Sequence, residues 1–260
     1  MNCEAIGLHI QEWLSAYCAQ ARMDGFIVGI SGGIDSALTS TLCAMTGKAT
    51  LIVTMPIRQT SAEYGRAIEH IDDLKKRFPN VTGMEVNLTD IFEQMERDFP
   101  NDVVANHLAM ANTRARLRMT TLYALGQAHK RLVAGTGNRV EDFGVGFYTK
   151  YGDGGVDVSP IADLTKTEVR AVAAHLGIVD SIIVAKPTDG LWADGRSDED
   201  QLGASYPELE WAMDYTGSED NLNERQLTVL ALYRRLHAVN KHKMEPIPVC
   251  LIPREWKVNS

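Results

Sequence analysis

Short apolar runs alternate along the chain with longer stretches in which apolar residues recur at helical spacing. Strand-length runs separated by helices are typical of a parallel sheet that helices cover on both faces. The runs are almost continuously apolar, as expected for strands buried on both faces. The sequence therefore predicts an α/β fold with a doubly wound, mostly parallel sheet and flanking helices. The predicted strands are "FIVGI" (26–30), "LIVTM" (51–55), "VTGMEV" (81–86) and "RLVAGT" (131–136).

Helical spacing of apolar residues predicts helices between and beyond these strands. The first covers 4–21, another 163–176, and the last lies near 223–239. The helical segment 102–129 carries enough apolar side chains for a core or an interface. The polar, glycine-containing stretch 187–208 is predicted to be a long loop, and such loops in compact domains often act as lids.

Composition narrows the class of protein. The 260 residues are 45% hydrophobic and 23% charged, which suits one globular domain over 1–260. The net charge of −8 argues against nucleic-acid binding, which needs a basic face. Four scattered cysteines without a C-x-x-C pair indicate a reducing compartment. Without a signal-peptide pattern or an apolar stretch of membrane length, we expect a cytoplasmic protein that binds no membrane.

The segment "SGGIDS" (31–36) follows the first predicted strand and carries the strongest chemical signal. Glycines allow a tight turn, and a helix beginning near Asp35 directs free N–H groups back at that turn, which makes an anion site. Asp35 would lie where a carboxylate could hold Mg²⁺ against the anion. The alternative is a plain turn with Asp35 or Ser36 as N-cap. The segment lacks the Walker A lysine pattern.

"SGGIDS" resembles the pyrophosphate-binding loop of the ATP pyrophosphatases, which cleave ATP between the α and β phosphates. Four further stretches together resemble NAD synthetase in that family. They are "NTRARLRM" (112–119), "GTGNRVED" (135–142), "GFYTKYGDGGVDVSPIADLTKTEV" (146–169) and "KPTDGLW" (186–192), with "TKYGDGG" (149–155) the most specific part. The resemblance implies an adenine nucleotide alpha hydrolase-like, Rossmann-like sheet, and a homodimer. The chain begins at the synthetase helix, without a glutaminase domain, so we expect the ammonia-using form.

The implied reaction joins ammonia to deamido-NAD, with ATP consumed to AMP and pyrophosphate through an NAD-adenylate. By resemblance, Mg²⁺ would be held by Asp35 and Glu141, with Asp142 as the substitute for Glu141, and Lys166 would steady the ATP phosphates. The implied ATP-binding residues are Gly29, Ile30, Ser31, Gly32, Gly33, Ile34, Asp35, Ser36, Thr136, Lys166 and Thr188. The implied deamido-NAD-binding residues are Arg116, Lys150, Asp157, His242 and Lys243.

Asp157 is the one acid among these basic substrate residues. We hypothesise that Asp157 lies near the nicotinate ring and orients or deprotonates ammonia, so the catalytic candidates are Asp35, Asp157 and Lys166. The segment 193–202 is hypothesised to be a lid that excludes water from the adenylate.

Two alternative functions stay open at this point. One is another ATP pyrophosphatase that adenylates a different carboxylate or carbonyl, as in tRNA modification. The other is a non-catalytic nucleotide-binding sensor on the same sheet. The charge of −8 and the "TKYGDGG" segment weigh against the first, and the full set of candidate site residues weighs against the second.

Overall fold

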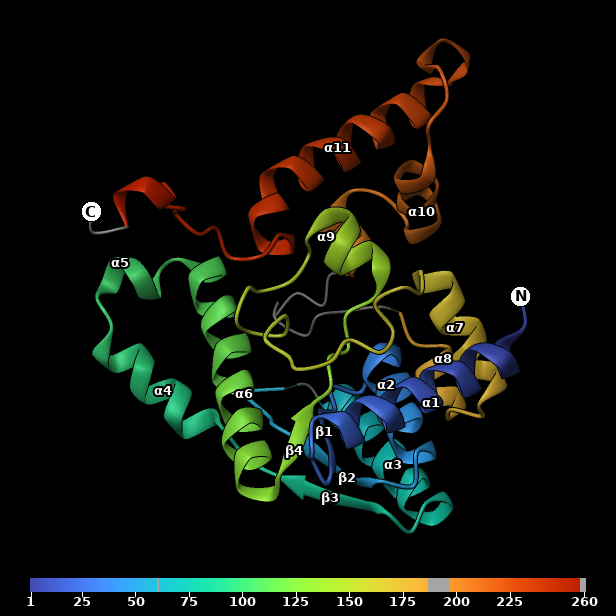
Figure 1. Cartoon of the computed structure of the whole chain (residues 1–260), viewed down its shortest axis with the longest axis vertical. Helices are drawn as coiled ribbons and strands as arrows, with labels where there is room; N and C mark the ends of the chain where they lie inside the picture. The colour runs from blue at the N-terminus through green and yellow to red at the C-terminus, as the bar shows by residue number, and fades with distance from the viewer. Residues whose placement is uncertain (60, 187–196, 258–260) are drawn as a thin grey trace.

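The computed structural model describes residues 1–59, 61–186 and 197–257 and contains a four-stranded parallel sheet (Figure 1). The strands are β1 (Gly25–Gly29), β2 (Ala49–Thr54), β3 (Val81–Glu85) and β4 (Arg131–Val133). Their order is β3-β2-β1-β4, and every adjacent pair is parallel. The order reverses between β1 and β4, so the predicted doubly wound sheet is confirmed, and its switch point lies beside β1.

Helices cover both faces of this sheet. They are α1 (Cys3–Gln20), α2 (Ile34–Met45), α3 (Ser61–Arg77), α4 (Thr89–Asp98), α5 (Asn101–Val104), α6 (His107–His129), α7 (Lys166–His175), α8 (Asp180–Ile183), α9 (Asp198–Leu202), α10 (Tyr206–Asp214) and α11 (Glu224–Met244). A π-helix, η1 (Arg139–Val145), follows β4, and the 3₁₀ turns are η2 (Glu219–Asn221) and η3 (Arg254–Trp256).

Side chains of β1 alternate between two hydrophobic cores. Phe26 and Val28 lie in a first core with α1, α2, α3, α7 and α8, whereas Ile27 lies in a second core with α4 and α6. All three are fully buried. Successive side chains of a strand point to opposite faces, so a strand covered on both faces is apolar at every position.

The edge strand β3 departs from the prediction. Val81 is buried, but Thr82, Gly83, Met84 and Glu85 are exposed. The expectation that this run is buried on both faces is therefore wrong, because β3 has a neighbour on one side only and few elements pack against it.

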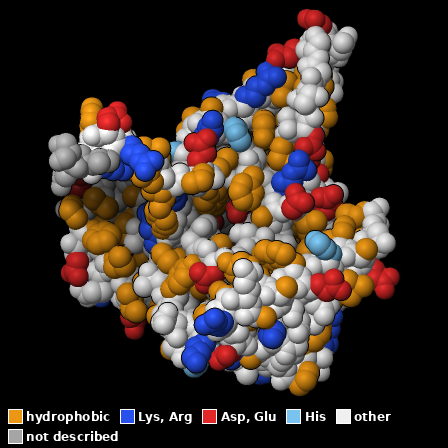
Figure 2. All heavy atoms as spheres, in the orientation of Figure 1, with side chains coloured by type: hydrophobic (Ala, Val, Ile, Leu, Met, Phe, Trp, Pro, Cys, Tyr) orange, Lys and Arg blue, Asp and Glu red, His pale blue; other side chains and the backbone are white. Residues whose placement is uncertain are grey.

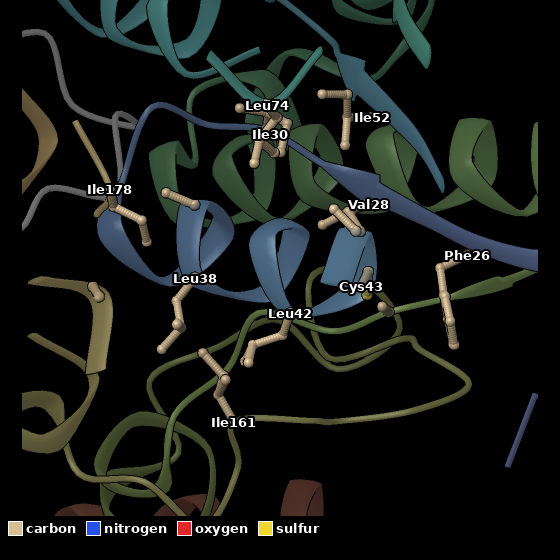
Figure 3. Packing of buried hydrophobic residues seen from close by; sticks show 14 of the residues in the cluster. Phe26, Val28, Ile30, Leu38, Leu42, Cys43, Ile52, Leu74, Ile161 and Ile178 are labelled. Atoms are coloured by element: carbon tan, nitrogen blue, oxygen red, sulfur yellow. The ribbon is translucent and has the colours of Figure 1, made fainter. Parts of the chain in front are cut away.

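Helix α2 is enclosed on nearly all sides, and Figure 3 shows Leu38 and Leu42 directed toward Ile161. Its buried hydroxyls need hydrogen-bond partners. Thr41 donates to the carbonyl of Ala37 at 2.8 Å, and Thr39 donates to the carbonyl of Gly135 at 3.2 Å. The Thr39 bond joins the middle of α2 to the segment after β4. Both parts of the chain contribute to the site.

Helix ends follow their capping residues. The helix predicted over 163–176 begins at Lys166 because Thr165 and Glu168 form a capping box. The helical segment 102–129 is divided into α5 and α6, with Asn106 as the N-cap of α6. The prediction of a loop over 187–208 is wrong for its second part, where α9 and the start of α10 form.

A third hydrophobic core lies beyond the sheet and joins η1, α10 and α11. Val140, Leu209 and Leu230 are its fully buried members. Figure 1 shows α10 and α11 at one end of the molecule, away from the strands. Among the described residues, no helix has the length and apolar character needed to cross a membrane.

Candidate active site

The turn after β1 is built as an anion site. The main chain passes from Gly29 through Ser31-Gly32-Gly33 into α2, and Gly33 is the N-cap without a side-chain bond to the helix. Asp35 and Ser36 lie inside the helix, so the alternative in which one of them caps it is wrong. The first N–H groups of α2 are therefore available to a bound anion.

Gly32 has to be glycine for two reasons. Its φ of +85° lies in the left-handed region that side chains rarely adopt. A Cβ at this position would also lie 2.4 Å from the carbonyl oxygen of Glu63. The turn can thus fold tightly against α3. Ser31 and Ser36 close it from within, because their hydroxyl oxygens are 3.2 Å apart.

Lys166 joins the two predicted metal-binding acids. Its Nζ lies 2.5 Å from Oδ2 of Asp35 and 2.9 Å from Oε1 of Glu141. Asp35 comes from α2, Glu141 from η1 and Lys166 from the first turn of α7. Asn138, the N-cap of η1, donates to Asp35 at 3.2 Å. The structure therefore brings these three predicted residues together.

Burial and the Lys166 ammonium act differently on the two carboxylates of this triad. Burial raises the pKa of Asp35, and the nearby Lys166 ammonium only partly offsets it. Burial also opposes ionisation of Glu141, but Lys166 and the hydrogen bonds of Tyr206 and Lys166 outweigh burial and hold its pKa below the usual value. The pKa of Lys166 is raised, because the two carboxylates overcome the opposing effect of its own burial. Lys166 is thus a permanent cation.

Glu141 and its neighbour Asp142 have different surroundings. Glu141 contacts Lys166, whereas Asp142 packs against Gly137 and makes no contact with that ammonium. Burial and the charge of Glu141 raise the pKa of Asp142 well above its usual range. Of the two acids, Glu141 is the one that shares a cation with Asp35.

A cavity of about 620 Å³ lies over the turn after β1. Its wall includes the whole 29–36 segment, Thr136, Glu141, Lys166 and Lys243, and none of the described residues that line it is a cysteine. The ATP-binding residues predicted from the resemblance therefore face one space, apart from Thr188, which lies outside the described residues. Of the hypothesised lid, 193–196 also lie outside them, and 198–202 form α9.

The predicted dinucleotide residues form a second group beside the cavity. Arg116 donates through Nε to the carbonyl of Lys150 at 3.3 Å, and Lys150 Nζ donates to the carbonyl of His242 at 2.7 Å. Lys243 Nζ donates to the carbonyls of Gly146 and Tyr148 at 2.8 and 2.9 Å. Only Lys243 among these lines the cavity.

Asp157 lies apart from the cavity. Its Oδ2 accepts from the N–H of Val133 at 2.8 Å, and its Oδ1 accepts from the hydroxyl of Tyr123 at 3.0 Å. Asp153, four residues earlier in the same segment, does line the cavity, and burial raises its pKa. The geometry therefore does not bring Asp157 to the residues expected to act with it.

Sequence reasoning missed Tyr206. Its side chain is 2% exposed, and its hydroxyl donates to Oε1 of Glu141 at 2.5 Å and lies 3.3 Å from Oδ2 of Asp198. The Lys166 ammonium lies 4.9 Å from the centre of its ring. No local motif marks this residue, because it follows the triad members by many positions along the chain.

Sequence reasoning also missed Arg118, which lines the cavity. Three arginines stand in the segment 112–119, and the resemblance selected Arg116. Successive residues of a helix are about 100° apart, so Arg116 and Arg118 point in very different directions. The rotation of α6 against the sheet decides which of them reaches the cavity.

Comparisons with known proteins identify the family of this chain. A sequence model of the NAD synthase family matches residues 7–246. The NH(3)-dependent NAD(+) synthetase of Mesoplasma florum is 34% identical over 252 residues, covering 96% of each chain. The solved structure of NMN synthetase from Francisella tularensis matches with a TM-score of 0.83 at 28% identity, over 98% of this chain and 99% of that one. The NH3-dependent NAD synthetase of Campylobacter jejuni, 23% identical, has the same fold, with a TM-score of 0.78 over 96% of this chain and 100% of that one. With the family match extending over most of its length, the chain belongs to the NAD synthase family.

Proposed function

We propose that this protein amidates deamido-NAD with ammonia, consuming ATP and releasing NAD, AMP and pyrophosphate. The observation that carries the proposal is the convergence on one cavity of the glycine turn, the N-terminus of α2 and the Lys166–Asp35–Glu141 triad. Membership of the NAD synthase family and the likeness to ammonia-dependent relatives support the same reaction.

The chemistry explains why such a site is needed. A carboxylate resists attack by ammonia because oxide would be the leaving group. An oxygen of the nicotinate carboxylate therefore attacks the α-phosphorus of ATP, and the bond from that phosphorus to the α,β-bridging oxygen breaks. Pyrophosphate departs with the electron pair onto the turn 31–36. Ammonia then attacks the acyl carbon, AMP leaves, and one proton is lost to give the amide. Positioning and charge neutralisation carry both steps.

The two carboxylates fit a magnesium ion that completes its coordination with phosphate oxygens. Mg²⁺ is usually held by one or two carboxylates together with substrate phosphates and water. One oxygen of Asp35 and one of Glu141 contact the same nitrogen, so a single cation position serves both. The described residues contain no group of three or more His, Cys, Asp or Glu that could hold a metal alone. When bound, the ion would neutralise phosphate charge, and Lys166 would then turn to the phosphates.

Ammonia needs a position next to the adenylate. An acid of the "TKYGDGG" segment and its neighbours would orient it, and Asp153 is favoured over Asp157 because Asp153 lines the cavity. Both carboxylates are held by hydrogen bonds, Asp157 by Val133 and Tyr123 and Asp153 by the N–H of Thr149 at 3.0 Å, so only the cavity position favours Asp153.

The experiment that tests the reaction combines the protein with ATP, Mg²⁺, deamido-NAD and ammonium and follows both NAD and the nucleotide product. NAD and AMP in equal amounts are expected. ADP in place of AMP would overturn the assignment of the turn 31–36. AMP formed without NAD would redirect the search to another acceptor.

The acid substrate itself is tested in a parallel reaction. Nicotinate mononucleotide replaces deamido-NAD, because the NMN synthetase of Francisella tularensis matches nearly the whole chain. A higher kcat/KM with the mononucleotide would make NMN the product of this protein instead of NAD.

The same proposal includes a cytoplasmic homodimer. Large apolar side chains in the C-terminal segment are exposed, including Val249 at 73%, Leu251 at 85% and Trp256 at 77%. Figure 2 shows apolar side chains gathered on the side where this segment and α4–α6 lie. A second copy would cover them. Light scattering should report twice the mass of the chain, and a monomer at micromolar concentration would contradict this assignment.

A further inference from the structure

The three arginines of α6 have different surroundings. Arg114 lies over the ring of Phe92, with 5.5 Å between its guanidinium carbon and the ring centre. Arg116 is exposed and donates to the carbonyl of Lys150. Arg118 alone of the three lines the cavity over the glycine turn.

No carboxylate of the described residues forms an ion pair with Arg118. Its Nε donates to the carbonyl of Met55 at 3.1 Å, and no carboxylate of the described residues lies within 4.0 Å of its guanidinium. Burial, reinforced by the charge of Arg114, lowers its pKa to about 10. Lys166, by contrast, is paired with two carboxylates. A largely buried cation that no carboxylate contacts is unfavourable unless a ligand anion meets it.

The position of Arg118 indicates which anionic group of the ligands it would contact. Met55 follows the end of β2, at the same edge of the sheet as the turn after β1. The acids whose charges act on Arg118 are Asp153 of the "TKYGDGG" segment and Glu63, whose carbonyl adjoins Gly32. Arg118 thus stands between the turn that would receive pyrophosphate and the segment that would face the acid substrate. The α-phosphate has to lie between those two groups when the phosphoryl bond is exchanged.

We propose that Arg118 is a further catalytic residue, whose guanidinium contacts the α-phosphate of ATP and neutralises the charge that develops on its oxygens during adenylation. The inference rests on the proposed function. In the step concerned, the carboxylate oxygen bonds to the α-phosphorus while the bond to the bridging oxygen breaks, and no proton moves to or from Arg118. A fixed donor beside the phosphorus favours this transition state over the bound substrates.

The test uses Arg118→Met, which keeps the apolar stem, and measures deamido-NAD-dependent exchange of labelled pyrophosphate into ATP. We expect a fall in the exchange kcat of roughly 100- to 1000-fold, the usual effect of removing one transition-state donor. Calorimetry should find the Kd of the Mg²⁺–ATP complex changed by only a few fold. Added methylguanidinium should restore part of the exchange rate, which would not follow from a structural defect. Arg97→Met, on exposed α4, removes the same charge away from the cavity and should leave exchange unchanged.

Three outcomes overturn the inference. Wild-type kcat in Arg118→Met would show that the α-phosphate does not need this residue. A raised KM for deamido-NAD with unchanged exchange kcat would assign Arg118 to the substrate carboxylate instead. A lowered thermal midpoint with no rescue by methylguanidinium would assign it a structural role. If the wild-type protein itself formed no NAD and catalysed no exchange, the proposed function would fail, whatever the variant did.

Discussion

His70 makes the stability of this protein sensitive to acid. The residue belongs to α3, faces α2 and is fully buried. Its Nε2 lies 2.9 Å from Oγ of Ser40, and Ser40 donates its only hydroxyl hydrogen to the carbonyl of Ala37. This arrangement favours the tautomer in which Nε2 carries the ring proton, and Nδ1 has no hydrogen-bond partner among the described residues. A second proton on the ring would be buried without an acceptor.

Burial is the main reason that the pKa of His70 falls from 6.5 to about 4, with nearby Asp73 and Arg77 acting in opposite directions. The unfolded chain therefore takes up a proton at higher pH than the folded protein does. The free energy of unfolding is unaffected above pH ~6.5 and declines as the pH falls toward about 4. At about 1.36 kcal/mol per pKa unit, the full loss is ~3.4 kcal/mol, of which about 2 kcal/mol is lost by pH 5.

The assay is urea unfolding of the wild-type protein and His70→Gln from pH 8 to pH 4.5. The amide of glutamine can keep the donor to Ser40, but it does not titrate. We expect the variant to start less stable and to lose about 2 kcal/mol less than wild type between pH 7.5 and pH 5. His129→Gln, at an exposed position in the last turn of α6, should retain the wild-type dependence. Parallel curves for wild type and His70→Gln would refute the reasoning.

Two further predictions concern the active site. Gly32→Ala should abolish ATP-dependent turnover, because the new Cβ meets a carbonyl oxygen. The control is Gly47→Ala, which is also at positive φ but has nothing within 4 Å of its Cβ, so it should cost ~1–2 kcal/mol of stability and keep activity. Equal loss of turnover in both variants would contradict this prediction. Tyr206→Phe removes a hydrogen bond to Glu141 and should raise the Mg²⁺ concentration for half-maximal rate roughly tenfold, as expected for a bond to a charged group. Tyr215→Phe, which loses a bond to the main-chain carbonyl of Ser218 just after the C-terminal end of α10, is the control. Identical Mg²⁺ curves for the two variants would show that the Glu141 bond has no such role.

The sheet and the glycine turn were predictable because their signals are local. A continuously apolar run followed by "SGGIDS" fixes a strand, a turn and a helix start in neighbouring residues. The exposure of β3 was not predictable, since strand order depends on contacts between distant segments. The choice of Arg118 over Arg116 depends on the rotation of α6. The bond from Tyr206 to Glu141 depends on how α10 packs against η1, which no spacing along the chain records.

The active site is assembled from elements that belong to two different hydrophobic cores. Glu141 and Tyr206 belong to elements held by the third core, whereas Asp35 and Lys166 belong to helices held by the first core. Elements with separate cores can open as separate cooperative units, which native-state hydrogen exchange detects as different opening free energies. If η1, α10 and α11 open first, the enzyme loses Glu141 while the glycine turn is still folded. Activity should then disappear at a lower urea concentration than the circular dichroism of the sheet, and bound nucleotide should close that gap.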